Sequence, residues 1–194
     1  QNNRTSYSSP VQIPGTTWST DNEKLGAGEF GFGAIKTDGT LWVWGLSQSD
    51  NWLGQNQSGP VTISSPVQIP GTTWKSFKGS GYSDRVFGIK TDGTMWGWGS
   101  NTRGELGQNN LTKYSSPVQI PGTTWSKMHS STYASAAIKT DGTLWAWGAN
   151  NNAQLGQNQA FPDLDGVSSP VQIPGTTWSS IALGQASVAA TKTD

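Results

Sequence analysis

Few side chains in this 194-residue sequence have types and spacing suited to chemistry. His129 is the only histidine, and as a general base it would need both an orienting acid and a nucleophile. Cysteine is absent, so thiolate and disulfide chemistry are excluded. Serine is so frequent that its nearness to His129 in the sequence indicates nothing. We therefore predict that the protein is not an enzyme and that His129 lies in a loop and faces solvent.

A recurring aspartate could suggest a ring of carboxylates. It is the third residue of a repeated Lys-Thr-Asp motif, as Asp38, Asp92, Asp141 and Asp194. Asp-Gly favours a type I′ hairpin turn with positive φ at both residues, so turn chemistry accounts for the series. The lysine two residues earlier balances each charge. The turn glycines are predicted to be structural: Gly39, Gly93 and Gly142.

Metal and cofactor sites have little support. The segment Asp163-Leu164-Asp165-Gly166 is similar to the start of a calcium loop, but the later oxygen ligands and the final glutamate of such a loop are missing. No glycine-rich stretch carries the lysine of a phosphate-binding loop. We predict no metal ion and no cofactor.

The elements that position these residues are set by an internal repeat. The segment Ser-Ser-Pro-Val-Gln-Ile-Pro-Gly-Thr-Thr-Trp occurs four times, at 8–18, 64–74, 115–125 and 168–178. The whole chain, 1–194, is therefore one repeat array, with repeats over roughly 8–63, 64–114, 115–167 and 168–194, the last of them partial. A period of about 50 residues is typical of a propeller blade or a solenoid unit.

Strand chemistry favours the propeller. A continuous apolar strand, Leu/Met-Trp-x-Trp-Gly, follows each complete Asp-Gly turn. Its two tryptophans stand at i and i+2 and therefore lie on one face of the strand. We predict a structural role for these tryptophans: Trp42, Trp44, Trp96, Trp98, Trp145 and Trp147. The opposite face carries Leu or Met and a smaller residue, which predicts large-against-small packing between blades. Four strands are expected per repeat, in the first repeat Val11–Ile13, a short one after Trp18, roughly Phe32–Thr37 and Thr40–Gly45. The predicted fold is all-β, a β-propeller of four-stranded antiparallel blades, with no helical periodicity.

The segment Trp98-Gly99-Ser100-Asn101-Thr102-Arg103-Gly104-Glu105-Leu106-Gly107 resembles the signature of the regulator of chromosome condensation repeats, and the wording of the copies is similar to bacterial and phage versions. The resemblance implies a β-propeller, commonly with seven blades. Residue 1 lies within a repeat, and Asp194 stands at a hairpin turn. We therefore expect the chain to be part of a larger ring, with completion by another copy of itself as the alternative.

Two classes of loop vary in length, and variable loops on a rigid scaffold are where binding usually resides. The stretch between the Thr-Thr-Trp tryptophan and the Lys-Thr-Asp lysine has 17, 15, 13 and 13 residues in successive repeats. The stretch after Leu-Gly-Gln-Asn and before Ser-Ser-Pro has 7, 5 and 9 residues. Aromatic and arginine side chains are favoured at interfaces. The predicted partner-binding residues are Glu29, Phe30, Phe32, Tyr82, Asp84, Arg85, His129, Tyr133, Phe161, Asp163 and Asp165.

The composition of the sequence excludes some classes of binding partner. Twelve basic residues balance twelve acidic ones, which argues against nucleic acid, and no apolar run of 18 residues suggests membrane insertion. We predict a non-catalytic scaffold that binds proteins, further copies of itself or the rest of a longer array, in an extracellular, cell-surface or virion setting. The alternatives are a regulator that exchanges guanine nucleotides on a small GTPase, which the resemblance to the family implies, and a secreted enzyme inhibitor. The low content of charged residues and the absence of the family's Gly-x-x-His motif are arguments against the nucleotide-exchange alternative.

Overall fold

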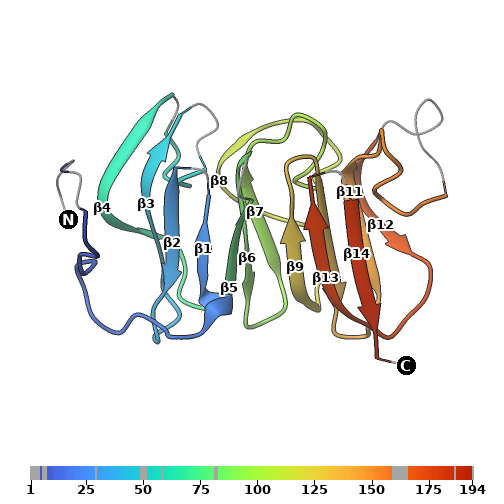
Figure 1. Ribbon diagram of the computed structural model, residues 1–194, viewed down its shortest axis with the longest axis horizontal. Coiled ribbons are helices and arrows are strands. Elements are labelled where there is room, and N and C mark those ends of the chain that lie inside the picture. Colours follow the sequence, from blue (N-terminus) through green and yellow to red (C-terminus); the bar gives the residue numbers. More distant parts are fainter. Residues whose placement is uncertain are drawn as a thin grey trace.

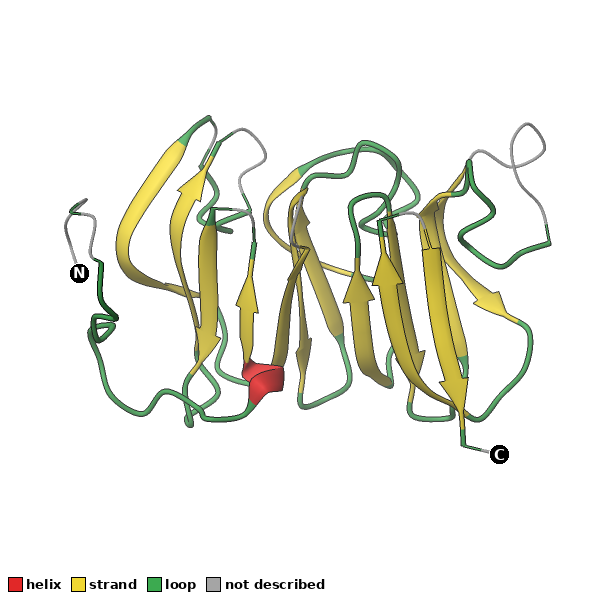
Figure 2. Ribbon diagram, viewed as in Figure 1, coloured by secondary structure: helices red, strands yellow, loops and turns green. Residues whose placement is uncertain are grey.

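The computed structural model describes residues 5, 8–28, 30–48, 52–57, 59–80, 83–158, 166–185 and 187–193. Within these ranges the chain forms antiparallel strands and a single 3-10 turn, η1 (Asn22–Lys24) (Figure 2). The strands are β1 (Leu25–Ala27), β2 (Gly31–Ile35), β3 (Leu41–Ser47), β4 (Val61–Ile69), β5 (Trp74–Ser80), β6 (Ser83–Lys90), β7 (Met95–Gly99), β8 (Tyr114–Gln119), β9 (Trp125–Ser130), β10 (Ala134–Lys139), β11 (Leu144–Ala149), β12 (Gly166–Ile173), β13 (Trp178–Gly184) and β14 (Ser187–Lys192).

The strands form a row of meandering sheets that stand side by side (Figure 1). Three sheets have four strands, β1–β4, β5–β8 and β9–β12, and β13 and β14 form a two-stranded sheet. The first strands of successive sheets, β1, β5, β9 and β13, contact one another, so they lie along one side of the row. The predicted all-β fold of four-stranded antiparallel sheets is confirmed.

The sheets are offset from the sequence repeats. Each Ser-Ser-Pro-Val-Gln-Ile segment after the first pairs with the tryptophan strand of the repeat before it, for example Gln68 with Trp42 and Gln119 with Trp96. The first copy has no tryptophan strand before it in the sequence, and its residues Val11–Ile13 form no strand. The prediction of a strand there is wrong, because each later copy forms its strand by pairing with a tryptophan strand that stands before it, and the given sequence offers none before Val11.

The Asp-Gly hairpins also differ from the predicted type I′ turn. Gly39 has φ +79°, but Asp38 is not at positive φ. The Gly39 N–H donates to Lys36 O at 3.0 Å, and the Lys36 N–H donates to Thr40 O at 2.9 Å. This is the three-residue hairpin, a type I turn followed by a left-handed residue, which requires positive φ only at the glycine. A Cβ on Gly39 would collide with the Thr72 carbonyl, a second reason for glycine at this position.

The core lies in the seams between sheets. In the first seam, an aromatic face of the second sheet packs on an aliphatic face of the first sheet: Trp74, Phe77 and Trp98 meet Ile35, Leu41 and Val43. The second seam repeats the pattern one sheet further on, with Trp125, Met128 and Trp147 against Phe87, Ile89 and Met95. These side chains are buried, and their packing holds the row together. The first seam has the expected large-against-small layering, whereas in the second seam the facing wall carries the large ring of Phe87, which packs on Trp147 at 6.4 Å between centroids.

Candidate functional site

The variable connections emerge from one end of every sheet. Because neighbouring strands are antiparallel, the connections after β1, β3, β5, β7, β9, β11 and β13 leave the same end, and the Asp-Gly and Pro-Gly turns leave the other (Figure 1). We name the first end the loop face and the second the turn end. Both classes of length-variable loop therefore share one surface, which the repeat alone did not establish.

The predicted partner-binding residues divide into three groups. Five lie outside the described residues: Glu29, Tyr82, Phe161, Asp163 and Asp165. Phe30, Tyr133 and His129 lie at or near the loop face. Phe32, Asp84 and Arg85 lie within strands β2 and β6 rather than in loops.

Tyr133 forms an exposed patch together with residues of the neighbouring sheet. Its side chain is 37% exposed, and the Arg103 guanidinium carbon lies 5.5 Å from its ring centroid. Arg103 Nη1 donates to Asn151 Oδ1 at 3.3 Å, so the patch spans the second and third sheets. Neither Arg103 nor Asn151 was among the predicted binding residues, because both stand just after a Trp-x-Trp-Gly strand, outside the two loop classes that vary in length. An arginine stacked on an exposed tyrosine is nevertheless typical of an interface core.

A hollow of about 400 Å³ lies beside this patch, where β5, β9 and β13 end. Its walls come from three sheets and, apart from Leu183, consist of small or polar residues: Gly79, His129, Ser130, Ser131, Thr132, Gly184 and Gln185. The hollow therefore lies on the side where the first strands of successive sheets meet.

His129 lies in strand β9, not in a loop as predicted, and it is half-buried. Its Nδ1 is buried and has no hydrogen-bond partner among the described residues. Burial and the nearby Lys78 ammonium lower the pKa of His129 below its usual value of 6.5. The ring is therefore neutral at pH 7, and no carboxylate of the described residues is hydrogen-bonded to its Nδ1.

The lowered pKa of His129 predicts a loss of stability in mild acid. The unfolded chain takes up the proton more readily than the folded one, so this contribution is complete above about pH 6.5 and declines as the pH falls through that value. Urea unfolding of the wild type and of His129→Gln at pH 7.5 and 5.0 measures it. We expect the wild type to lose more stability between the two pH values than the variant. An equal loss in both proteins would contradict the prediction.

Phe32 and Asp84 lie in strands, and their positions there determine how far each side chain is exposed. Phe32 is 55% exposed on the outer face of the first sheet, where its ring stacks on Trp44 at 6.2 Å between centroids. Asp84 stands near the start of β6 and is half-buried, and its carbonyl accepts a hydrogen bond from the Ser100 N–H at 2.7 Å.

Arg85 is only 1% exposed, so the prediction that it is presented to a partner is wrong. Its Nη2 pairs with Glu105 Oε1 at 3.0 Å, and Glu105 is equally buried. Its other donors bind backbone carbonyls: Nη1 to Ser131 at 2.7 Å, Nη2 also to Thr132 at 3.0 Å, and Nε to Ser100 at 3.2 Å. Arg85 thus ties the second sheet to the loop that begins after β9 in the third sheet.

At the turn end, the aspartates perform a structural role. Asp38 Oδ1 accepts from the Thr40 N–H at 3.0 Å and from its hydroxyl at 2.7 Å, and Trp42 Nε1 donates to Thr40 Oγ1 at 2.8 Å. The same arrangement recurs at Asp92 and Asp141. The threonine hydroxyl bond is the main cause that lowers the pKa of all three carboxyls. Asp194 lies outside the described residues.

The repeated lysines of these turns lie over tryptophan rings. Lys36, Lys90 and Lys139 each place Nζ 4.3–4.4 Å from the ring centroid of the first tryptophan in their own tryptophan strand. Within the described ranges, no three His, Cys, Asp or Glu side chains are grouped so as to hold a metal ion. In the same part of the chain, no helix has the length and apolar character needed to span a membrane.

Four-stranded antiparallel sheets that stand face to face, with their first strands adjoining on one side, define a segment of a β-propeller. The model of the Regulator of chromosome condensation (RCC1) repeat matches residues 92–138 and 141–191, about half of the chain. The chain therefore belongs to the RCC1 repeat family.

Known relatives agree with this assignment. The mitochondrial RCC1 domain-containing protein RUG3 of Arabidopsis thaliana is 27% identical over 94 residues, which are 45% of this chain and 21% of that protein. Human WBSCR16 matches with a TM-score of 0.71 and 19% identity, over 90% of this chain and 47% of that one. Yeast RCC1 (Prp20) in complex with Kap60 matches with a TM-score of 0.70 and 18% identity, over 88% and 42%. The chain thus spans less than half the length of each of these relatives.

Proposed function

We propose that this chain is a non-catalytic β-propeller scaffold that binds protein partners through its loop face. The observation that carries the proposal is the division of the sheets into two ends. Both classes of loop that vary between repeats emerge at the loop face, whereas the turn end repeats the same Asp-Thr-Trp contacts three times. Variation confined to one surface of a constant scaffold is the usual arrangement of a binding protein.

The patch of Arg103 and Tyr133 is the part of the loop face best suited to a partner. Arg103 offers a planar set of donors that matches a carboxylate, and the exposed ring of Tyr133 offers apolar area. A partner segment with an acidic side chain next to an apolar one would meet both. The adjoining hollow beside His129 would receive the flanking residues.

Similar structures support protein binding. One describes yeast RCC1 (Prp20) bound to Kap60, and another describes Prp20p of Saccharomyces cerevisiae and its binding properties to Gsp1p and histones. These partners are those of the yeast protein. The extracellular, cell-surface or virion setting expected from the wording of the repeats remains part of this proposal, and the relatives named above come from a plant, human and yeast.

Binding through the loop face is tested by comparing variants at the loop face with a variant at the turn end. Proteins retained by the immobilised chain are identified, purified and titrated against wild type, Arg103→Ala/Tyr133→Ala and Thr123→Ala. Thr123 is exposed at the turn end of the third sheet and serves as the matched control. We expect the double variant to lose about tenfold or more in affinity, the range of an interface hot spot, and the control to bind as the wild type does. An equal loss in both variants would contradict the proposal.

A second candidate function is guanine-nucleotide exchange, which the likeness to Prp20p and the reference to Gsp1p in its description favour. Release of a fluorescent nucleotide from small GTPases, with and without this chain, separates the two functions. We expect no acceleration. A clear acceleration would replace the scaffold proposal by the regulatory one.

A further inference from the structure

The hollow of about 400 Å³ beside His129 has the size of a ligand site. It lies where β5, β9 and β13 end at the loop face, and these first strands contact one another along one side of the row. The blades of a propeller stand around a central channel, and adjoining first strands lie on the side of that channel. The hollow therefore opens on the channel side of the loop face.

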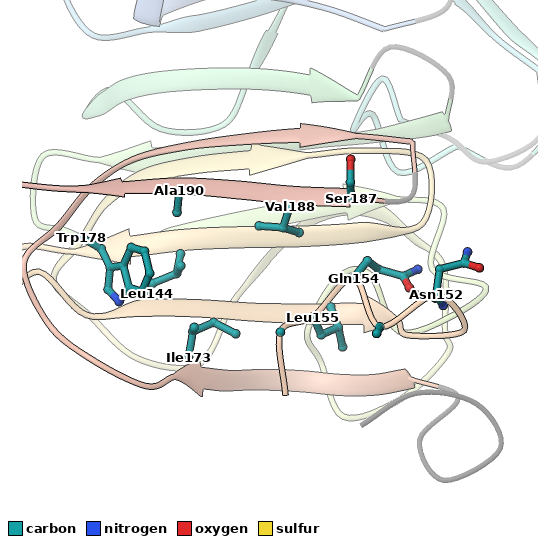
Figure 3. A pocket seen from close by; sticks show the side chains of 11 residues that line it. Leu144, Asn152, Gln154, Leu155, Ile173, Trp178, Ser187, Val188 and Ala190 are labelled. Carbon is teal, nitrogen blue, oxygen red and sulfur yellow. Dashed lines mark hydrogen bonds between the residues drawn. The ribbon is translucent and has the colours of Figure 1, made fainter. Parts of the chain in front are cut away.

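A second hollow, of about 320 Å³, lies between the sheet β9–β12 and the pair β13–β14 (Figure 3). The side chains labelled in Figure 3 are mostly apolar, and none of the described residues that line this hollow is ionisable. The hollow beside His129 differs because it combines a titratable ring with several hydroxyl groups. Of the two, it is therefore the one suited to a polar or charged ligand.

Strand β9 directs His129 away from the second seam. Met128 is buried in that seam, and successive residues of a strand point to opposite faces, so Lys127 and His129 share the face towards β13. In agreement with this direction, the Lys127 ammonium donates to the Ser179 carbonyl of β13. His129 Nδ1 is enclosed and has no partner among the described residues, so Nε2 is the ring nitrogen that a ligand in the hollow can reach.

The other polar groups of the hollow divide into bonded and free ones. Ser131 Oγ donates to the Ala134 carbonyl at 3.2 Å, and Arg85 holds the carbonyls of Ser131 and Thr132. The Thr132 hydroxyl and the Gln185 amide have no hydrogen bond to any described residue. Both can donate to an anion, as can the imidazole when it carries a second proton.

The charged groups around the hollow favour an anionic ligand. Strand β13 carries no charged residue, and no acidic side chain is among the described residues that line the hollow. Arg85 is neutralised by Glu105, and Lys78 pairs with Glu23 at 3.1 Å in a partly exposed contact. The other strands packed against β9 carry mostly cations: Lys75, Lys78, Asp84, Arg85, Lys90 and Lys139.

Protonation of His129 is the part of this site that a ligand would change. Burial and the Lys78 ammonium lower the pKa of His129, whereas the backbone of Ser130 and the Glu23 carboxylate raise it only in part. An opposite charge within about 4–6 Å favours the charged form of a titratable group. A carboxylate in the hollow would therefore favour a proton that the ring does not carry at pH 7 in the free chain.

We propose that the hollow binds a carboxylate, carried by an aspartate or glutamate side chain of the partner, and that His129 takes up a proton from solvent as the carboxylate binds. The imidazolium Nε2, the Thr132 hydroxyl and the Gln185 amide donate to the two carboxylate oxygens. This inference rests on the function proposed for the loop face, because it assigns one chemical group of the partner to one part of that surface. Its consequence is tighter binding in mild acid.

The probe is the peptide acetyl-Ala-Glu-Ala-amide, and acetyl-Ala-Gln-Ala-amide is its matched control. Each is titrated into the full chain at pH 7.5 and 5.5 at constant ionic strength. His129 is the only histidine, so its imidazole proton resonances report on the hollow without ambiguity. We expect the glutamate peptide to shift these resonances and to bind about threefold or more tightly at pH 5.5 than at pH 7.5, where less of the imidazole is protonated. Equal responses to the two peptides, no shift of the His129 resonances, or no gain in acid would overturn the proposal.

Two variants locate the proton. His129→Gln keeps a polar side chain that does not titrate and is expected to lose the gain in affinity at pH 5.5. Lys75→Gln removes an exposed lysine from β5 and is expected to keep it. Circular dichroism checks that both variants are folded, and the wild-type resonances alone decide the matter if His129→Gln does not fold. A gain in acid that persists in His129→Gln would assign the proton to another group and overturn the proposal.

The two proposals can fail separately. Arg103→Ala/Tyr133→Ala lies outside the hollow and is expected to leave the response of His129 to the glutamate peptide unchanged. A partner that needs Arg103 and Tyr133, together with a hollow that does not respond to the glutamate peptide, would reject this inference alone. A hollow that responds as expected, together with a partner indifferent to Arg103 and Tyr133, would reject the binding mode proposed for the loop face and leave the carboxylate site standing.

Discussion

Replacement of Arg85 by alanine is expected to lower the free energy of unfolding by about 3–5 kcal/mol, the usual effect of removing one partner of a buried ion pair. The substitution leaves the Glu105 carboxylate buried without its guanidinium. It also removes the donors that hold the carbonyls of Ser100, Ser131 and Thr132. Chemical denaturation followed by tryptophan fluorescence measures the change.

Two further variants make this result specific. Arg103→Ala removes an exposed arginine from the same sheet and is expected to change stability by no more than about 0.5 kcal/mol. Replacing both partners, as in Arg85→Met/Glu105→Leu, removes the unpaired charge and is expected to recover much of the loss. A loss below about 1 kcal/mol for Arg85→Ala would show that the ion pair is not part of the stable core.

Trp98→Ala is expected to cost about 3–5 kcal/mol, because it opens a large cavity in the first seam and leaves the carbonyl of Trp52 without its donor. The ring is fully buried and contacts Trp74 and Phe77. Denaturant unfolding monitored by near-ultraviolet circular dichroism measures the change.

Trp44→Ala is the matched control for Trp98→Ala. Trp44 holds the same strand position in the first sheet, but its ring is only partly buried and contacts Trp18 and Phe32 on the outer face. We expect it to cost less than half as much. Equal losses for the two substitutions would mean that burial in a seam is not what makes these tryptophans stabilising.

Features within one repeat were predictable from the sequence. Alternation places Trp96 and Trp98 on one face of β7 and Met95 on the other, and this pattern alone gives the layering of the seams. Which segment forms the fourth strand of each sheet was not predictable from one repeat. Gln68 pairs with Trp42 across a sequence separation that includes a variable loop, and no local signal tells whether the Ser-Ser-Pro segment ends one sheet or begins the next.

The error about Arg85 has a definite cause. Position 85 pairs with Gly99, and the equivalent residues that pair with the strand glycine in the other two sheets are Gly31 and Ala134. Arginine there was interpreted as loop diversity. Its partner Glu105 departs from the other repeats as well, because Trp52 and Gln154 stand at that position. Two opposite charges confined to one repeat were the signal that could have identified the buried pair.

The same comparison accounts for Trp52, the one tryptophan that belongs neither to a Thr-Thr-Trp nor to a Trp-x-Trp-Gly motif. In the first sheet, Trp52 is buried, and a Cβ on Gly31 would collide with its indole. The space that Arg85 and Glu105 fill in the second sheet is thus occupied in the first by a large ring above a glycine. The pairs Gly31–Trp52 and Arg85–Glu105 are two packing solutions for one site, so exchanging a single member of either pair is expected to be destabilising.

The offset between sheets and repeats has a consequence for cooperativity. The strand that closes the first sheet, β4, continues directly into β5, which opens the second. Backbone hydrogen bonds also join successive sheets, because the Trp74 N–H donates to Gly39 O at 3.0 Å and the Trp125 N–H donates to Gly93 O at 2.9 Å, so unravelling one sheet breaks bonds to its neighbour in addition to side-chain contacts in the seam. In a linear repeat protein, nearest-neighbour coupling of this kind raises the free energy of partly unfolded states relative to fully folded and fully unfolded ones. We therefore expect the sheets of this chain to unfold together rather than one at a time.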